Sequence, residues 1–279
     1  TLNPFDTDVD EDGAPYGLGA TNLTSFGLAF LDEMLGGFAK GETTGLLGLT
    51  GNGKTLLQVQ IAAAIAQSGI PILYCSYEQG FAGDMAERFY SCVGEFDRTP
   101  MRGKTYKDYP PEIKAIVTSL KGQLKDTLIF GDMTKGNNGI NGLVDIKEMI
   151  DKHADKGHKP HVVLLDWLVP FMSRANYVTS TKEGDLRKAW SARYGNEVKD
   201  FAIANNIHFM ISHQLGTSVL KKPCTYKPNL SDAYDLGISF GQYMNTCLAL
   251  GQLSPERICW LHPCKARSSA AVSKIMKMN

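Results

Sequence analysis

Blocks of apolar residues along the chain predict strands separated by helices. Several of these blocks are apolar throughout, which is typical of strands buried on both faces of a parallel sheet. Their alternation with helical patterns predicts an α/β fold of the doubly wound kind, a mostly parallel twisted sheet with helices on both faces. The predicted strands are residues 43–48, 71–77, 127–130, 161–166, 207–212, 246–250, 257–261 and 270–276.

Apolar residues at helical spacing predict helices over residues 56–67, 143–152 and 185–204. Another helical pattern precedes the first strand and is ended by Gly36 and Gly37. The apolar members of that pattern are Phe26, Phe30, Leu31, Met34 and Leu35.

Two segments fall outside this alternation. Residues 1–21 are acidic with few large apolar groups, so they cannot bury enough surface to order themselves. We expect them to form a tail or linker before a single domain of residues 22–279. Residues 98–125 are basic and interrupted by Pro110 and Pro111, which predicts a surface excursion between two strands.

Composition narrows the class of protein. The 279 residues are 43% hydrophobic, which excludes disordered and fibrous proteins, and 29 basic residues balance 29 acidic ones. A neutral net charge argues against a broad basic surface that binds nucleic acid. It does not exclude a local basic loop or a pore lined by several subunits. The sequence has no apolar run of membrane-spanning length and no signal-peptide pattern, so we expect a cytoplasmic protein without a membrane partner.

The cysteine pattern fits that compartment. Six cysteines are scattered along the chain, several within apolar strand-like runs, and none forms a CxxC pair. We expect buried, reduced thiols.

The strongest motif is GLTGNGKT, residues 48–55, which fits GxxxxGK[ST] between an apolar strand and an Ala-rich helix. Such glycines let backbone N–H groups turn toward a phosphate at the helix N-terminus, while Lys54 reaches the outer phosphates and Thr55 offers a hydroxyl to Mg²⁺. A chance Gly-rich turn is the alternative. The predicted ligands are ATP and Mg²⁺, and the predicted ATP-binding residues are Gly48, Leu49, Thr50, Gly51, Asn52, Gly53, Lys54, Thr55 and Leu56.

Carboxylates at two predicted strand ends complete this chemistry. Asp166 follows four apolar residues and is the candidate for the magnesium side, with a helix-capping role as the alternative. The next residue is Trp167, so the base that polarises water must come from elsewhere. Glu78, at the end of another strand, is our candidate base; an exposed strand-end glutamate is the alternative.

Four further residues carry candidate roles. His213 and Gln214 end a predicted strand, where either could sense the γ-phosphate, although a buried histidine or a turn glutamine fits the sequence equally. Lys265 and Arg267 are two apart and share a face of an extended segment. They could enter a neighbouring subunit's site as arginine-finger elements, or they could be solvated surface charges.

In their order along the chain, these motifs resemble the RecA-type ATPase domain of hexameric replicative helicases, the DnaB and phage T7-type group. The resemblance begins near Thr24 and includes CSYEQ, VVLLDWL, ISHQLG and the KAR element. It implies that Lys54 and Thr55 are the Walker A pair, that Glu78 is the catalytic glutamate and that Asp166 is the Walker B aspartate. Lys265 and Arg267 would then act in trans as piston lysine and arginine finger, and His213, ahead of Gln214, would be the sensor.

The resemblance also implies a ring, expected to be a hexamer, that hydrolyses ATP at subunit interfaces to move along single-stranded DNA in bacterial or phage replication, with a primase or loader as candidate partners. The N-terminal collar or primase domain of such helicases is missing from this sequence, so we expect either a fragment or a stand-alone ATPase with another loader.

One departure concerns the loop that contributes to DNA binding in the family. Residues 231–237 keep its frame, including Asp235 and Gly237, but Tyr234 stands where the family has an arginine. Lysines just upstream could supply the missing charge, namely Lys221, Lys222 and Lys227. The alternative functions are a recombinase- or KaiC-like ATPase and a nucleotide-dependent assembly or regulatory protein.

Overall fold

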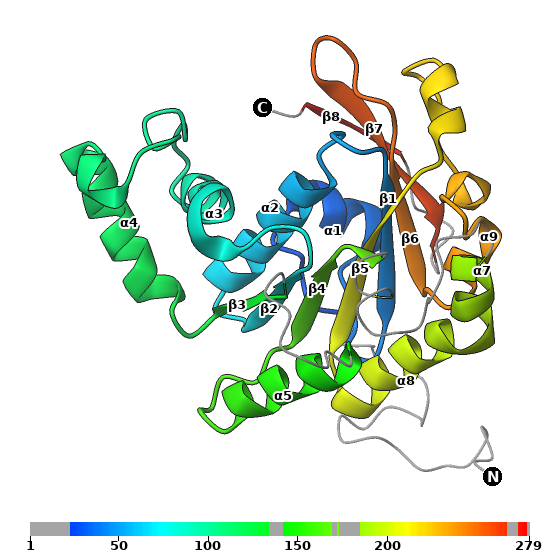
Figure 1. The fold of residues 1–279 in the computed structure, drawn as a ribbon, viewed down its shortest axis with the longest axis horizontal. Helices are drawn as coiled ribbons and strands as arrows, with labels where there is room; N and C mark the ends of the chain where they lie inside the picture. The colour runs from blue at the N-terminus through cyan, green and yellow to red at the C-terminus, as the bar shows by residue number, and fades with distance from the viewer. Residues whose placement is uncertain (1–22, 134–141, 169–171, 173–184, 267–272, 278–279) are drawn as a thin grey trace.

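The central element of the fold is an eight-stranded sheet with the order β3-β2-β4-β5-β1-β6-β7-β8 (Figure 1). The computed structural model describes residues 23–133, 142–168, 172, 185–266 and 273–277. β1 to β6 run parallel, and β7 and β8 add an antiparallel edge. The strands are β1 (Thr43–Gly48), β2 (Ile72–Ser76), β3 (Leu128–Asp132), β4 (Val162–Asp166), β5 (His208–Gln214), β6 (Thr246–Leu250), β7 (Ile258–Lys265) and β8 (Lys274–Lys277).

Helices cover both faces of the sheet, which confirms the predicted doubly wound α/β arrangement (Figure 1). Apolar side chains of α1 to α4 form one core layer against the sheet, and those of α5 and α7 to α9 form the other. The helices are α1 (Ala29–Leu35), α2 (Lys54–Gln67), α3 (Ala86–Val93), α4 (Pro111–Leu124), α5 (Leu143–Ala154), α7 (Asp185–Ala189), α8 (Gly195–Asn205) and α9 (Ile238–Gln242).

The burial of the strands explains their apolar sequences. In β1, Leu46 packs into one layer and Leu47 into the other, and both are fully buried. α2 follows the glycine loop and is buried over most of its surface, so it too is apolar on nearly every side. Every predicted strand overlaps an observed one, although residues 270–272 of the last prediction lie outside the described part of the chain.

The predicted helix over residues 185–204 is confirmed, with one irregularity. A wider π-helical turn at Trp190–Tyr194 joins α7 to α8 within a continuous helical path. The Trp190 indole is buried and its Nε1 donates to the Ser239 carbonyl at 2.9 Å. A Cβ on Gly195 would lie 2.0 Å from the Tyr243 ring, so this glycine admits a close approach. Tertiary packing therefore overrides the regular helical period here.

One expectation needs correction and another needs an addition. Phe26 lies before α1 rather than on its helical face, where its backbone N–H donates to the Asp32 carboxylate at 2.7 Å. The excursion of residues 98–125 does lie between two strands, β2 and β3, as predicted, and it also contains the amphipathic helix α4, which begins at Pro111, a favourable first helical residue. The sequence showed the prolines but not the buried face that follows them.

The cysteine prediction is confirmed in part. All six are free thiols; Cys75, Cys247 and Cys259 are buried, and the other three are half-buried. No helix among the described residues is long and apolar enough to cross a membrane.

A buried histidine joins the start of β5 to the segment around α1. His208 packs against the rings of Phe26 and Phe38, and its Nδ1 donates to the Ala39 carbonyl at 3.0 Å. Its Nε2 has no hydrogen-bond partner among the described residues. Burial lowers the pKa of His208 from 6.5 to about 4, although the bond to Ala39 opposes that shift. The imidazole is therefore neutral in the fold.

This neutral histidine makes the fold sensitive to acid. Between about pH 6.5 and pH 4 the unfolded chain binds a proton at His208 that the folded chain excludes, so the free energy of unfolding falls as the pH falls. We expect a loss of up to about 3 kcal/mol from this residue, and no contribution to pH dependence above about pH 7. Urea unfolding across this range measures it.

His208→Gln keeps a donor for Ala39 but cannot titrate, so it should flatten part of this pH dependence. The control is His158→Gln, because His158 is half-exposed. An identical slope for the wild type and His208→Gln would contradict the assignment.

Candidate functional site

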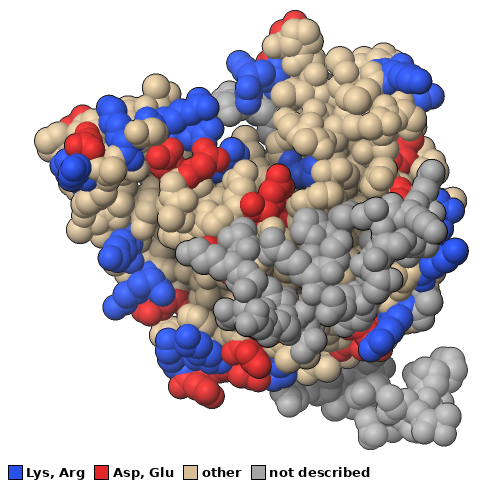
Figure 2. Space-filling view, in the orientation of Figure 1, with Lys and Arg blue, Asp and Glu red and all other residues tan. Residues whose placement is uncertain are grey.

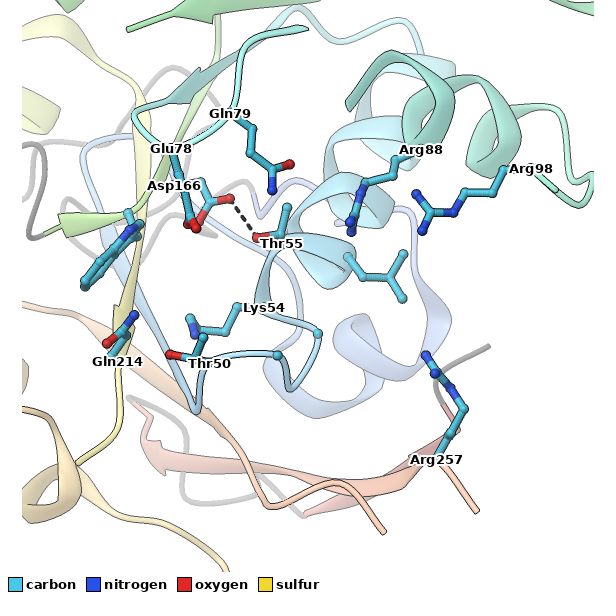
Figure 3. A pocket seen from close by; sticks show the side chains of 14 residues that line it. Thr50, Lys54, Thr55, Glu78, Gln79, Arg88, Arg98, Asp166, Gln214 and Arg257 are labelled. Carbon is cyan, nitrogen blue, oxygen red and sulfur yellow. Dashed lines mark hydrogen bonds between the residues drawn. The ribbon is translucent and has the colours of Figure 1, made fainter. Parts of the chain in front are cut away.

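A pocket of about 330 Å³ lies where the carboxyl ends of β1, β2, β4 and β5 meet (Figure 3). The strand register places these ends together, since Ser76 pairs with Asp166 and Gly48 pairs with Gln214. The pocket is lined by Thr50, Gly51, Gly53, Lys54, Thr55, Leu56, Glu78, Gln79, Arg88, Arg98, Asp166, Trp167, Gln214 and Arg257.

The glycine loop between β1 and α2 forms the floor of this pocket. Gly51 and Gly53 have φ values of 78° and 87°, in the left-handed region that glycine adopts without strain. A Cβ on Gly48 would lie 2.8 Å from Cγ of Lys54, so a larger residue there would displace the lysine. The loop thus turns tightly into the N-terminus of α2, which is a favourable place for an anion.

Lys54 is held in place by its own loop. Its Nζ donates to the carbonyls of Gly48 and Leu49 at 2.9 and 3.0 Å. Burial lowers the pKa of Lys54, and the nearby carboxylates of Asp166 and Glu78 oppose that shift. A charged, partly desolvated lysine here would interact strongly with a phosphate.

Most of the residues predicted to bind ATP line the pocket, with three exceptions. Gly48 and Leu49 contribute carbonyl oxygens to Lys54, and the Leu49 side chain belongs to the core. The Asn52 side chain turns away and donates to the Gly251 carbonyl at 2.8 Å. Asn52 therefore ties the loop to the residue after β6.

Asp166 accepts hydrogen bonds from three different elements. Its Oδ2 accepts from Thr55 at 2.8 Å and from Tyr74 at 3.0 Å, and its Oδ1 accepts from Ser212 at 3.0 Å. Burial, together with the Asp166 charge, raises the pKa of Tyr74 well above its usual range, so the phenol keeps its proton. The side chain is thus fixed against the first turn of α2, as Figure 3 shows.

The hydroxyl of Thr55 and the carboxylate of Asp166 form an oxygen donor pair at the phosphate side of the pocket. Mg²⁺ prefers oxygen ligands of this kind. In nucleotide sites it usually binds one or two protein oxygens together with the phosphates. The two residues predicted to hold Mg²⁺ are therefore adjacent, and their chemistry fits the ion.

Glu78 lies beside Asp166, and both side chains extend into the pocket (Figure 3). Glu78 is exposed, whereas Asp166 is buried. The two carboxylates differ accordingly: Asp166 is fixed by donors, while Glu78 can contact water within the pocket.

The structure separates the two candidates for a sensor. Gln214 lines the pocket, whereas His213 is fully buried beside the Phe240 ring and its Nε2 donates to the Tyr234 carbonyl at 2.8 Å. Burial lowers the pKa of His213 to about 4, so the ring is neutral. Gln214, rather than the favoured His213, is thus the residue that can touch a ligand in the pocket.

Sequence reasoning missed three arginines of the pocket wall. Arg88 belongs to α3, Arg98 follows it, and Arg257 immediately precedes β7 (Figure 3). Arg88 and Arg98 both bond to Asp84, which holds them side by side. Their only sequence signal was a basic character around residue 98, which does not say where the side chains point.

Lys265, one of the two cations predicted to act in trans, is not among the residues that line this pocket. Lys265 Nζ donates to the carbonyls of Gly241 and Met244 at 2.7 and 2.6 Å. It pairs with Cys247 near the start of β6, away from the carboxyl ends of the parallel strands. Arg267 lies outside the described residues.

The residues predicted to bind DNA follow β5. Lys221 and Lys222 are exposed at the end of a short helical turn, with Lys222 over the Tyr226 ring. Lys227 lies over the Trp260 ring, 4.4 Å from its centroid. Asp235 and Gly237 have positive φ values, of 54° and 51°, and form a tight turn after the exposed Tyr234.

A glycine-loop pocket at the carboxyl edge of a mostly parallel, helix-covered sheet is the arrangement of a RecA-like fold. Residues 24–238 match the family described as "DnaB-like helicase C terminal domain", and the chain belongs to this family. No curated protein sequence matches the chain.

Solved structures share the fold at low identity. The chain is similar to a structure described as an "ATPase Domain", with TM-score 0.72, 16% identity, and coverage of 92% of this chain and 89% of that one. The chain is also similar to a structure described as a DnaB-like replicative helicase and its interactions with primase, with TM-score 0.70 and 14% identity. The match covers 93% of this chain and 61% of that one. The RadB recombinase gives TM-score 0.56 and 16% identity, with coverage of 91% of this chain and 96% of that one.

The position of Lys54 gives a direct test of phosphate binding. Lys54→Ala removes the one cation held within the glycine loop itself and should weaken binding of a fluorescent ATP analogue by roughly tenfold to a hundredfold, since hydrogen bonds to charged groups contribute about 1.5 to 3 kcal/mol. Lys40→Ala, an exposed lysine before β1, is the matched control. Equal affinities for the two variants would contradict the assignment of the pocket.

Proposed function

We propose that the chain is an ATP-driven translocase of the replicative helicase kind, which hydrolyses ATP between subunits of a ring and moves along single-stranded DNA. The observation that carries this proposal is the meeting of Lys54, Thr55, Asp166 and Glu78 in one pocket. Membership of the DnaB-like family supports the same activity.

The pocket has room for a nucleoside triphosphate. The phosphates would lie on the glycine loop, where Lys54 and the N-terminus of α2 neutralise their charge. A second cavity of about 720 Å³ shares Leu56, Arg88, Arg98 and Arg257 with the first, and would hold the nucleoside.

In the proposed reaction Glu78 accepts the proton of an attacking water, because its carboxylate is the accessible one beside the phosphate site. Asp166 and Thr55 would hold Mg²⁺, which supplies charge neutralisation for the transferred phosphate when bound. Lys54 stabilises the charge that develops on the phosphate oxygens.

Main-chain contacts offer a route from this pocket to the loop after β5. The Tyr234 N–H donates to the Gln214 carbonyl at 2.8 Å, and the Gly216 N–H donates to the Asp232 carbonyl at 2.7 Å. A change at Gln214 on loss of the γ-phosphate would therefore move Tyr234, which lies in the proposed DNA-binding loop.

The proposal is tested by steady-state ATP hydrolysis with and without unstructured single-stranded DNA, at low salt and at a protein concentration that permits assembly. We expect stimulation that declines as salt rises. Turnover indifferent to DNA would instead favour the nucleotide-dependent assembly or regulatory protein.

Glu78→Gln should lower DNA-stimulated turnover by about 10²- to 10⁴-fold while ATP binding persists, because it removes the base but keeps the shape of the side chain. Glu112→Gln, on the exposed side of α4, is the matched control. A Glu78→Gln variant with wild-type turnover would show that the base is another residue.

Assembly is tested separately through Arg267. If this arginine completes a neighbour's site, Arg267→Ala and Glu78→Gln will each be inactive alone, but a mixture will regain activity, because some interfaces pair an intact Glu78 with an intact Arg267. The measurement is hydrolysis across a titration of the two variants. A mixture as inactive as its components would contradict action in trans, and an Arg267→Ala variant with wild-type turnover would place Arg267 outside the reaction.

A further inference from the structure

An exposed aromatic ring and an exposed arginine meet at the loop after β5. Tyr234 is 52% exposed. Arg187, on α7, is also exposed, and its Nε donates to the carbonyl of Asp235, the residue after Tyr234, at 3.0 Å. Two elements almost fifty residues apart in sequence thus place an exposed arginine against the main chain next to an exposed tyrosine.

The backbone of Tyr234 is clamped on both sides of the ring. Its N–H donates to the Gln214 carbonyl, and its own carbonyl accepts from His213 Nε2, each at 2.8 Å. These main-chain bonds set the direction of the Tyr234 Cα–Cβ bond, and changes to the ring leave them intact.

Neither exposed group is committed to a polar partner that would block a ligand. Among the described residues, no hydrogen bond involves the Tyr234 hydroxyl and no carboxylate lies within ion-pair distance of Arg187. Arg187 uses only Nε on Asp235, which leaves its two terminal nitrogens to donate to an anion.

The lysines upstream are less suited to this position. The Lys227 ammonium lies over the ring of Trp260, a residue of β7. The Lys222 ammonium lies over the ring of Tyr226, whose hydroxyl donates a hydrogen bond to Asp232. Arg187, by contrast, is held next to Tyr234 by its hydrogen bond to the Asp235 carbonyl, and it comes from a different part of the sequence.

We infer that Tyr234 and Arg187 form a two-point contact for a single nucleic-acid strand, in which Tyr234 stacks on a base and Arg187 binds an adjacent phosphate. This inference rests on the proposed DNA function and names how the strand is held. An exposed aromatic ring provides a stacking surface for any base, and a guanidinium with free terminal nitrogens binds phosphate bidentately. Such a contact requires unpaired bases, which double-stranded DNA keeps stacked inside the helix.

The test separates the base from the phosphate. Binding is measured by fluorescence anisotropy with ATP present, for oligothymidylate and for an abasic strand of equal length, which keeps the phosphates but lacks the bases. We expect the wild type to bind oligothymidylate about fivefold or more tightly than the abasic strand, the range that alanine substitution at stacking residues gives. Tyr234→Phe should keep this preference and Tyr234→Ala should lose it.

Arg187→Ala should weaken binding to both strands alike, and should reduce the salt dependence of the affinity by about one phosphate contact per engaged subunit. Two matched controls lie outside the proposed contact. Tyr106→Ala removes a tyrosine of similar exposure, 49%, on the segment before α4, and Lys188→Ala removes the exposed cation next to Arg187. Both controls should bind as the wild type does.

The outcomes distinguish this inference from the function on which it rests. Equal wild-type affinity for the two strands, with hydrolysis still stimulated by DNA, would overturn the stacking role and leave the translocase proposal standing. An unchanged salt dependence in Arg187→Ala would overturn the phosphate role. Binding to neither strand would overturn the proposed DNA function itself.

Discussion

The Asp166 carboxylate is the interaction on which the site depends. It accepts hydrogen bonds from Thr55 in the first turn of α2, from Tyr74 on β2 and from Ser212 on β5. A single buried charge therefore holds four elements in register, β4 included. Such a charge is tolerated only because donors satisfy it, so these three hydroxyls and the carboxylate have to be present together. The shape of the phosphate pocket follows from that arrangement.

The sequence predicted this edge of the sheet well, and for a physical reason. Asp166 and Glu78 stand at the ends of apolar runs, Lys54 and Thr55 follow the glycine loop after another, and the carboxyl ends of parallel strands meet at one edge. Local sequence therefore carries their positions. The π-helical turn between α7 and α8 was not predictable in this way, since it accompanies the contact between Trp190 and Ser239, far apart in the chain.

Other parts of the site depend on information that no local pattern contains. Successive residues of a strand point to opposite faces, so the choice between His213 and Gln214 needs the register of β5 against β1, in which Gly48 faces Gln214. Arg88, Arg98 and Arg257 enter the pocket from α3, from the segment after it and from the start of β7. Only packing brings them together, and surface arginines carry no periodic signal that would reveal it.

The neutral charge of the chain bears on how it would hold DNA. On the described part of the face drawn in Figure 2, basic and acidic side chains are interspersed and form no broad basic surface. Electrostatic affinity grows with the number of phosphates neutralised, so a protein with few cations at the strand must gain affinity from another source. Stacking on Tyr234 is such a source, because it depends on the bases and is insensitive to the net charge of the protein. In the proposed ring of subunits this contact would be repeated in every subunit, so a weak interaction per chain would suffice for a motor that must also release the strand at each step.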